Sequence, residues 1–179
     1  MRRYGRVIFE KGEDATGILH EALALSQTSG NNLGIYVIYA FLAEQALRNN
    51  NADLALSYLE HAKLNPSTAD PWINGCYAKL YALRGDVALA EQYLENSTRP
   101  TDAAEAYLIL KDNEQAKIYA LAAYKWAWHD GPPFCLHYEL ERAKTVLKSL
   151  NIPEPQYPLK QINSHIAFEK EIRQFIEAL

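Results

Sequence analysis

Residues 35–62 read IYVIYAFLAEQALRNNNADLALSYLEHA, and they decide the fold class because two apolar stripes flank a polar turn. The first stripe contains Ile35, Ile38, Tyr39, Leu42, Ala43 and Ala46, and the second contains Leu54, Ala55, Tyr58, Leu59 and Ala62. Apolar residues that recur at intervals of three and four positions share one face of a helix. Asn49, Asn50 and Asn51 interrupt the pattern. The stretch therefore predicts two antiparallel helices joined by a tight turn.

The next block of the chain repeats this plan. A first stripe with Tyr77, Ala78 and Tyr81 is followed by the turn Gly85-Asp86, and a second stripe begins at Ala90. Ala55 and Ala90 occupy equivalent places and lie 35 positions apart. A period of about 34 residues is that of tetratricopeptide repeats, each of which is a pair of helices.

From Tyr4 to about Ala123 the chain resembles tetratricopeptide-repeat (TPR) proteins. The segments EKGEDATGILHEALAL (10–25) and RNNNADLALSYLEHAKLNP (48–66) are similar to the turn and second helix of that repeat. The family's template has three small residues per repeat, at which the two helices approach closely. The corresponding residues are Gly5, Gly17 and Ala24, then Ala43, Ala55 and Ala62, then Ala78, Ala90 and Ser97, and finally Ala104, Ala116 and Ala123.

The resemblance implies an all-α fold: a right-handed α–α superhelix, or TPR solenoid, of about four helix pairs with a C-terminal capping helix. The array would span residues 1–151, with repeats at about 1–31, 35–66, 71–98 and 101–129 and a divergent helix at 133–150. A proline-containing loop at 152–164 and the capping helix at 165–179 would follow. The segment YGRVIFEKGE (4–13) has the composition of a strand, but the repeat register predicts that it belongs to the first helix.

Composition limits the classes of function. The chain has 179 residues, enough for one domain with its own core, and a net charge of −4, which disfavours nucleic-acid binding. No apolar run approaches the roughly 18 residues of a membrane span. The only cysteines, Cys76 and Cys135, have no C-x-x-C spacing, which is typical of reduced thiols in a cytoplasmic protein.

No catalytic motif is present in the sequence: it lacks G-x-x-x-x-G-K-[ST], G-x-S-x-G and H-E-x-x-H. His129-Asp130 and His137-x-Glu139 suggest a metal or acid–base site, but no pair of histidines has i, i+4 spacing. We therefore expect no enzymatic activity, no cofactor and no metal.

Two further groups of residues have alternative interpretations. Trp126, Trp128, Phe134 and Tyr138 fit an aromatic cage or, as we favour, packing near the end of the array. Glu139, Glu141, Arg142 and Lys144 suggest a solvated helix face.

The resemblance implies that function lies on the concave groove lined by the first helix of each repeat. The groove positions correspond to Arg6, Val37, Phe41, Glu44, Arg48, Trp72, Cys76, Lys79 and Leu83. The Lys and Asn residues with which some TPR proteins clamp acidic chaperone tails are absent, since the matching positions hold Arg2 and Arg6, Ala40 and Glu44, and Gly75 and Lys79. Phe41 and Trp72 would instead anchor a peptide or helix of a protein partner.

We therefore expect a non-catalytic protein-interaction module that binds a peptide or helical segment of a partner. The alternative is a sensor domain for a small ligand or signalling peptide within a larger regulatory protein. The 38-residue spacing from Gly17 to Ala55 is similar to that of the longer repeats in bacterial signalling ATPases and transcription regulators. The first helix has no preceding repeat to cover Tyr4, Ile8 and Phe9. We therefore expect an exposed apolar end that meets either a partner or the rest of a longer parent chain.

Overall fold

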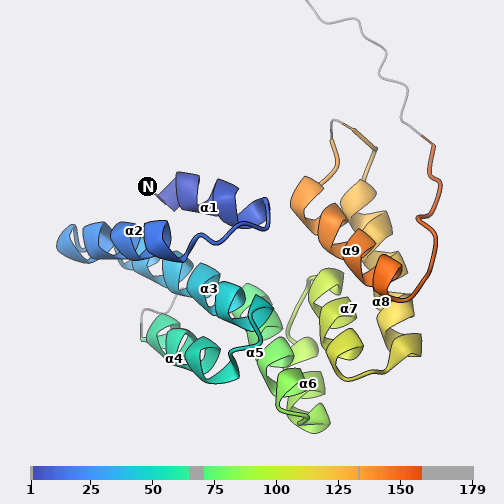
Figure 1. The fold of residues 1–179 in the computed structure, drawn as a ribbon, viewed down its shortest axis with the longest axis horizontal. Coiled ribbons are helices and arrows are strands. Elements are labelled where there is room, and N and C mark those ends of the chain that lie inside the picture. Colours follow the sequence, from blue (N-terminus) through green and yellow to red (C-terminus); the bar gives the residue numbers. More distant parts are fainter. Residues whose placement is uncertain (1, 65–70, 133, 159–179) are drawn as a thin grey trace, which may run out of the picture.

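The computed structural model describes residues 2–64, 71–132 and 134–158, without the side chains of Arg2, Arg3, Tyr4 and Arg6. This part of the chain contains nine helices and no strand (Figure 1). The helices are α1 (Arg2–Glu10), α2 (Thr16–Thr28), α3 (Asn32–Arg48), α4 (Ala52–Lys63), α5 (Pro71–Leu83), α6 (Val87–Leu94), α7 (Pro100–Ile109), α8 (Asn113–Trp128) and α9 (His137–Ser149). The predicted all-α class is confirmed, and the strand-like segment at 4–13 lies mostly in α1.

Three helix pairs share one turn design. The turns at residues 49–51, 84–86 and 110–112 join α3 to α4, α5 to α6 and α7 to α8. The middle residue of each has a positive φ, and the next residue caps the following helix; these residues are Asn50 (54°), Gly85 (75°) and Lys111 (63°), followed by Asn51, Asp86 and Asp112. Each cap side chain accepts a hydrogen bond from the backbone N–H three positions later. This satisfies a donor that would otherwise be unpaired at the helix start.

Small residues let the helices of these pairs pack closely. Ala43, Ala55 and Ala62 are fully buried, and so are their counterparts Ala78, Ala90, Ala104, Ala116 and Ala123. Ser97 is half-buried. In these pairs every alanine that the sequence predicted at a helix contact is therefore buried.

In the first pair the register is wrong for the second helix. Gly17 and Ala24 are exposed, whereas Leu19 takes the buried place at the fourth residue of α2, as Ala55 does in α4. The turn at residues 11–15 is two residues longer than the other three, which moves α2 along by two positions. Gly5 makes room for the larger side chain, because a Cβ at Gly5 would lie 3.0 Å from Leu19 Cδ2.

The first helices of the pairs form an inner layer. Contacts run from α1 to α3, from α3 to α5, from α5 to α7 and from α7 to α9, while α4, α6 and α8 lie outside them. Figure 1 shows the pairs following one another around a bend, which brings α1 towards α9. After α9, residues 151–158 run back along α8, and Tyr157 packs against Tyr124 and Trp128. The predicted capping helix at 165–179 lies outside the described residues.

The expected exposed apolar end is wrong for Phe9. This side chain is fully buried, because its ring packs edge-on against Phe41 of α3 at a centroid distance of 5.1 Å and against Tyr138 of α9 at 5.8 Å. The bend of the array, rather than a preceding repeat, covers it.

Among the described helices, none has the length and hydrophobicity needed to cross a membrane.

Candidate functional site: a charged cavity on the inner layer

A cavity of about 630 Å³ lies on the inner layer of helices. Its lining comes from the end of α1 (Glu10, Lys11, Gly12), from α3 (Glu44, Leu47, Arg48), from α5 (Lys79), from α7 (Glu105, Leu108, Ile109) and from α9 (Tyr138, Glu141, Arg142, Thr145, Val146). We call it the inner cavity. Several lining residues, including Lys11, Arg48 and Thr145, are exposed, so the cavity opens to solvent.

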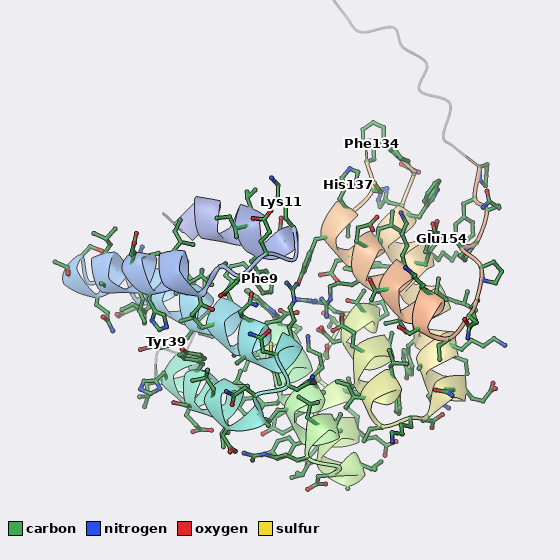
Figure 2. The ribbon with its side chains drawn as sticks, in the orientation of Figure 1. Phe9, Lys11, Tyr39, Phe134, His137 and Glu154 are labelled. Carbon is green, nitrogen blue, oxygen red and sulfur yellow. The ribbon has the colours of Figure 1, made fainter. Side chains whose placement is uncertain are left out.

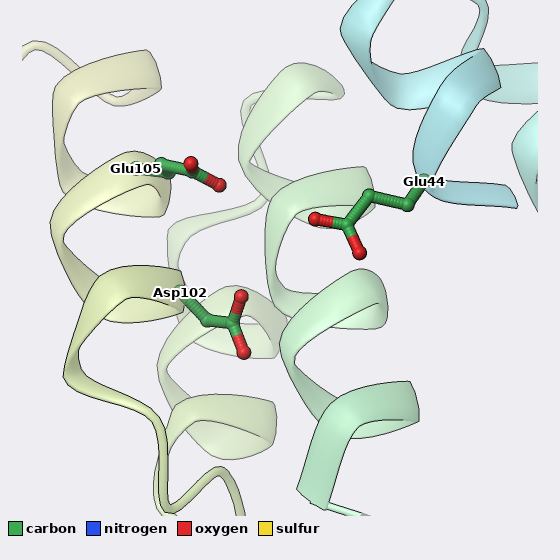
Figure 3. A group of neighbouring side chains, drawn as sticks. All are labelled: Glu44, Asp102 and Glu105. Carbon is green, nitrogen blue, oxygen red and sulfur yellow. The ribbon is translucent and has the colours of Figure 1, made fainter. Parts of the chain in front are cut away.

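Charged side chains that pair with one another line part of the inner cavity and continue beyond its lining. We call them the inner network: Glu44, Lys79, Arg99, Asp102, Glu105, Glu139 and Arg142. Figure 3 shows Glu44 on α3 facing Asp102 and Glu105 on α7. The Lys79 ammonium on α5 lies between these carboxylates, at 3.0 Å from Glu44, 3.4 Å from Asp102 and 3.2 Å from Glu105.

Arg142 brings α9 into the inner network. Its Nε and Nη2 donate to the two carboxylate oxygens of Glu105 at 2.8 and 2.6 Å, and Nη2 also reaches Asp102 Oδ1 at 2.6 Å. Its Nη1 donates to Glu139 Oε2 at 3.0 Å, one helical turn away. Two-pronged arginine–carboxylate contacts fix orientation as well as distance. The position of α9 against α7 is therefore specified by charge as well as by apolar packing.

The backbone of α5 lies very close to Asp102. A Cβ added at Gly75 would collide with the Asp102 carboxylate, which is fully buried. Glycine is therefore required at this position to let the carboxylate reach Lys79. Neutral groups complete the pairing: Trp72 Nε1 donates to Glu44 Oε2 at 2.7 Å, and Thr101 Oγ1 donates to Glu139 Oε2 at 2.6 Å.

The pairing determines the charge states of the inner network. Burial works against the charged form of Glu44, but Lys79 and Arg142 outweigh it and hold the pKa of Glu44 well below its usual range. Burial likewise opposes the charge on Glu105, and the same two cations lower its pKa to about 2. Although burial acts against their charges as well, the surrounding carboxylates raise the pKa of Lys79 and of Arg142. All four groups are thus charged at neutral pH.

Carboxylate oxygens of Glu44, Asp102 and Glu105 lie within 4.8 Å of one another, a spacing that suits a metal ion. However, the Lys79 and Arg142 cations already contact these oxygens and supply positive charge. We therefore interpret the group as an ionic network rather than as a metal site.

Tyr138 connects α9 with the start of the chain. Its hydroxyl accepts a hydrogen bond from Arg48 Nη2 at 2.7 Å and donates one to Glu44 Oε1 at 3.3 Å. Arg48 in turn lies over the Phe9 ring at 3.8 Å and donates to the Phe9 carbonyl at 2.9 Å. Burial, together with the charge of Glu44, raises the pKa of Tyr138. Tyr138 is therefore a neutral wall of the inner cavity that bridges α1, α3 and α9.

The structure places the nine predicted groove residues in different environments. Glu44, Arg48 and Lys79 line the inner cavity. Val37 and Leu83 are half-buried against the core, Cys76 is fully buried, and the side chain of Arg6 lies outside the described part. Burial raises the pKa of the Cys76 thiol.

Phe41, one of the two aromatic residues predicted to anchor a partner segment, is largely covered by its neighbours. It is 6% exposed and lies between Phe9 and the half-buried Trp72, whose ring centroid is 4.7 Å away. The binding role predicted for the nine residues remains a prediction.

Helix α9 differs from the solvated face that its sequence suggests. Arg142 is 7% exposed and belongs to the inner network with Glu139, whereas Glu141 and Lys144 do pair at the surface. Sequence reasoning missed this because two partners of Arg142, Asp102 and Glu105, lie on α7, far away in the chain. The available signal was the pair of acids Asp102 and Glu105, spaced to share one face of a helix otherwise rich in alanine.

The aromatic residues considered as a cage are dispersed. Trp128 stacks on Tyr124, Tyr138 contacts Phe9, and Trp126 and Phe134 are exposed at 42% and 51%. Figure 2 shows Phe134 in the α8–α9 connection and His137 at the start of α9. His129 approaches Asp130 at 3.4 Å on the surface, and the ring of His137 lies against the Cys135 sulfur. These residues give no support to a cage or metal site.

No family model matches the chain, and comparison with curated proteins and with solved structures gave no significant match.

Proposed function

We propose that this chain is a non-catalytic protein-interaction module, a right-handed TPR-type solenoid that binds a peptide or helical segment of a partner protein in the inner cavity. The observation that carries the proposal is the composition of the cavity wall. Within the described part of the chain, it is built from the inner-layer helices α1, α3, α5, α7 and α9 and the residues that follow α1. Stacked repeats use this concave surface to hold extended ligands.

Two features support the assignment to a repeat solenoid. The turn with a positive-φ residue followed by Asn or Asp recurs in three consecutive helix pairs. Each inner-layer helix also contacts the next one, and α2, α4, α6 and α8 each contact the inner helix that follows. A chain in which each unit contacts mainly its neighbours is the arrangement expected of a solenoid.

The charge states of the inner network support a binding role over a catalytic one. A general acid or base works best with a pKa near the ambient pH. Here the pKa of Glu105 is about 2, that of Lys79 is raised, and that of the Cys76 thiol is raised by burial. At neutral pH Glu105 is therefore a poor proton acceptor, Lys79 a poor proton donor and the Cys76 thiol a poor nucleophile. We infer that the pairing of the charged groups in the inner network serves to hold the cavity in shape.

A sensor for a small ligand is the second candidate, and the size of the cavity favours it. Small-molecule sites commonly enclose about 300–1,000 Å³, a range that includes the inner cavity. We favour a protein segment because the mouth is bordered by exposed side chains from the turn after α1, from α3 and from α9 that a longer ligand would contact. Because the chain has a net charge of −4, we propose that it binds a cytoplasmic protein partner, or another part of a longer parent chain, rather than nucleic acid or a membrane.

The test uses a library of displayed random peptides and a variant that fills the cavity. Thr145 is exposed on α9 and lines the inner cavity, so Thr145→Trp would occupy ligand space without disturbing a buried contact. Lys148 is exposed on the same helix but does not line the cavity, which makes Lys148→Trp the matched control. Peptides selected on the unaltered protein should bind Lys148→Trp normally and Thr145→Trp weakly. Equal binding to both variants would refute the proposed site.

A further inference from the structure

The cations that line the inner cavity differ in whether they contact a carboxylate. Arg48 hydrogen-bonds only to neutral acceptors, the Phe9 carbonyl and the Tyr138 hydroxyl, and contacts no carboxylate among the described residues. The exposed Lys11, at the end of α1 (Figure 2), makes no side-chain hydrogen bond or ion pair within the described part of the chain. Two positive charges at the cavity wall therefore have no carboxylate partner among the residues that the structure describes.

The carboxylates of the cavity wall, in contrast, are already engaged. Glu44 and Glu105 are paired with Lys79 and Arg142, as described above. The Glu141 carboxylate lies 2.8 Å from the Lys144 ammonium. Glu10 also takes part in a hydrogen bond or electrostatic interaction. A basic ligand would have to compete with these contacts, whereas an acidic ligand would meet free positive charge. Charge complementarity therefore favours an acidic ligand.

An apolar wall accompanies the two cations. Leu108 and Ile109 on α7 are half-buried and line the cavity, together with the buried Leu47 of α3 and Val146 of α9. Half-buried apolar side chains in a cavity gain from contact with an apolar ligand group. An ion that carries only charge would leave this wall uncovered.

Resting on the proposed function, we infer that the inner cavity binds a protein segment that carries an Asp or Glu side chain together with a bulky apolar side chain. The carboxylate pairs with Arg48 and Lys11, and the apolar group covers Leu108 and Ile109. Arg48 is held in place by Phe9 and Tyr138, so it presents its guanidinium without further ordering. The freely exposed Lys11 adds attraction at the mouth of the cavity.

The experiment selects from the displayed random-peptide library and then synthesises one selected peptide. We expect the enriched sequences to combine Asp or Glu with Leu, Ile or Phe. Lys11→Met should lower the affinity for the selected peptide about fivefold, the effect of one partly exposed ion pair. The control Arg84→Met removes a surface cation outside the cavity, paired with Asp53, and should leave the affinity unchanged.

The role of Arg48 is tested with a double-mutant cycle. The effect of one change in the peptide is compared between the unaltered protein and a protein variant, so a general effect of the variant on the fold cancels. Replacing the peptide's acidic residue by its amide should weaken binding to the unaltered protein more than tenfold. The same replacement should have little effect on the double variant Lys11→Met, Arg48→Met, while Arg48→Lys should keep most of the preference for the acidic peptide.

Three outcomes separate this inference from the proposed function. Acidic, apolar peptides whose binding depends on Lys11 and Arg48 support both. Peptides that Thr145→Trp excludes but that are neutral or basic, and indifferent to Lys11→Met, overturn the inference and leave the binding site standing. A selection that yields no peptide dependent on the cavity overturns both.

Discussion

Arg142 of α9 binds Glu105 of α7 side-on, with Nε 2.8 Å from Oε1 and Nη2 2.6 Å from Oε2. These residues are 37 positions apart, and each is on an inner-layer helix. Removing Arg142 would leave the buried carboxylate of Asp102 and the half-buried carboxylate of Glu105 with too little positive charge. The pair therefore links the shape of the inner cavity to the stability of the fold.

Arg142→Met should lower the free energy of unfolding by about 3–5 kcal/mol, the usual cost of removing one partner of a buried ion pair. Urea denaturation followed by far-ultraviolet circular dichroism measures it. Lys144→Met, on the same helix, removes a cation whose partner Glu141 is 69% exposed at its side chain, and should cost at most about 1 kcal/mol. Similar losses for the two variants would show that the inner network does not stabilise the fold.

Two glycines should respond to alanine with opposite signs. Gly75→Ala places a methyl group against the Asp102 carboxylate and should destabilise the protein by about 1–3 kcal/mol. Gly17→Ala meets no atom within 4 Å on the exposed side of α2, and should stabilise the helix by up to about 1 kcal/mol. Thermal denaturation of the two variants compares them directly. A stabilising Gly75→Ala would contradict the close approach of α5 to Asp102.

The buried alanines should not accept larger side chains. Ala55→Leu and Ala90→Leu put extra methylene groups between closely packed helices, so each should lower the free energy of unfolding by about 1–3 kcal/mol. Ala24→Leu is the control, because Ala24 is exposed although the sequence register predicted it to be buried. A urea midpoint that falls for Ala24→Leu as much as for the other two would restore the register that the structure corrects in α2, and unchanged midpoints for Ala55→Leu and Ala90→Leu would contradict the close packing of these helices.

Acid should weaken the inner network. Against the cost of burial, nearby cations lower the pKa of Glu44 and Glu105, the latter to about 2. A carboxyl whose pKa is lower in the folded state stabilises the fold above its unfolded-state pKa of about 4.3, and this stabilisation is lost as the pH falls towards the folded-state value. The free energy of unfolding should therefore decrease between about pH 4.5 and pH 2.

The matching variant for this pH dependence is Glu105→Gln. It removes one of the two groups that must be protonated, so its free energy of unfolding should fall less steeply over the same interval. Urea titrations at a series of pH values give both slopes. An unaltered slope in Glu105→Gln would show that this carboxyl is not held ionised by Arg142 and Lys79.

The helix pairs could be predicted from the sequence because their determinants are local. The apolar spacing of 35–62, the cap residues Asn51 and Asp86, and the alanines at the contact between helices all act within one repeat. The first pair departs from this register because its turn is longer, and a Leu19–Gly5 contact replaces contact between small residues.

The site could be predicted only in part, because it depends on how the array bends. Glu44, Arg48 and Lys79 were identified from their repeat positions and line the inner cavity. Whether Arg142 faces solvent or Glu105 is determined by the packing of α9 against α7, and whether Phe9 is bare or covered by Tyr138 is determined by the approach of α9 to α1. Such contacts join residues more than 35 positions apart and leave no periodic signal.

The most direct test of the central claim, that a partner segment binds in the inner cavity, is methyl NMR on the protein with isoleucine methyl groups labelled. Ile109 lines the inner cavity, whereas Ile118 is 56% exposed on α8 and does not line it. On addition of a peptide selected from the displayed library, the account predicts a large shift of the Ile109 methyl resonance and an unchanged Ile118 resonance. A shift of Ile118 with no change at Ile109 would place binding outside the inner cavity and contradict the account.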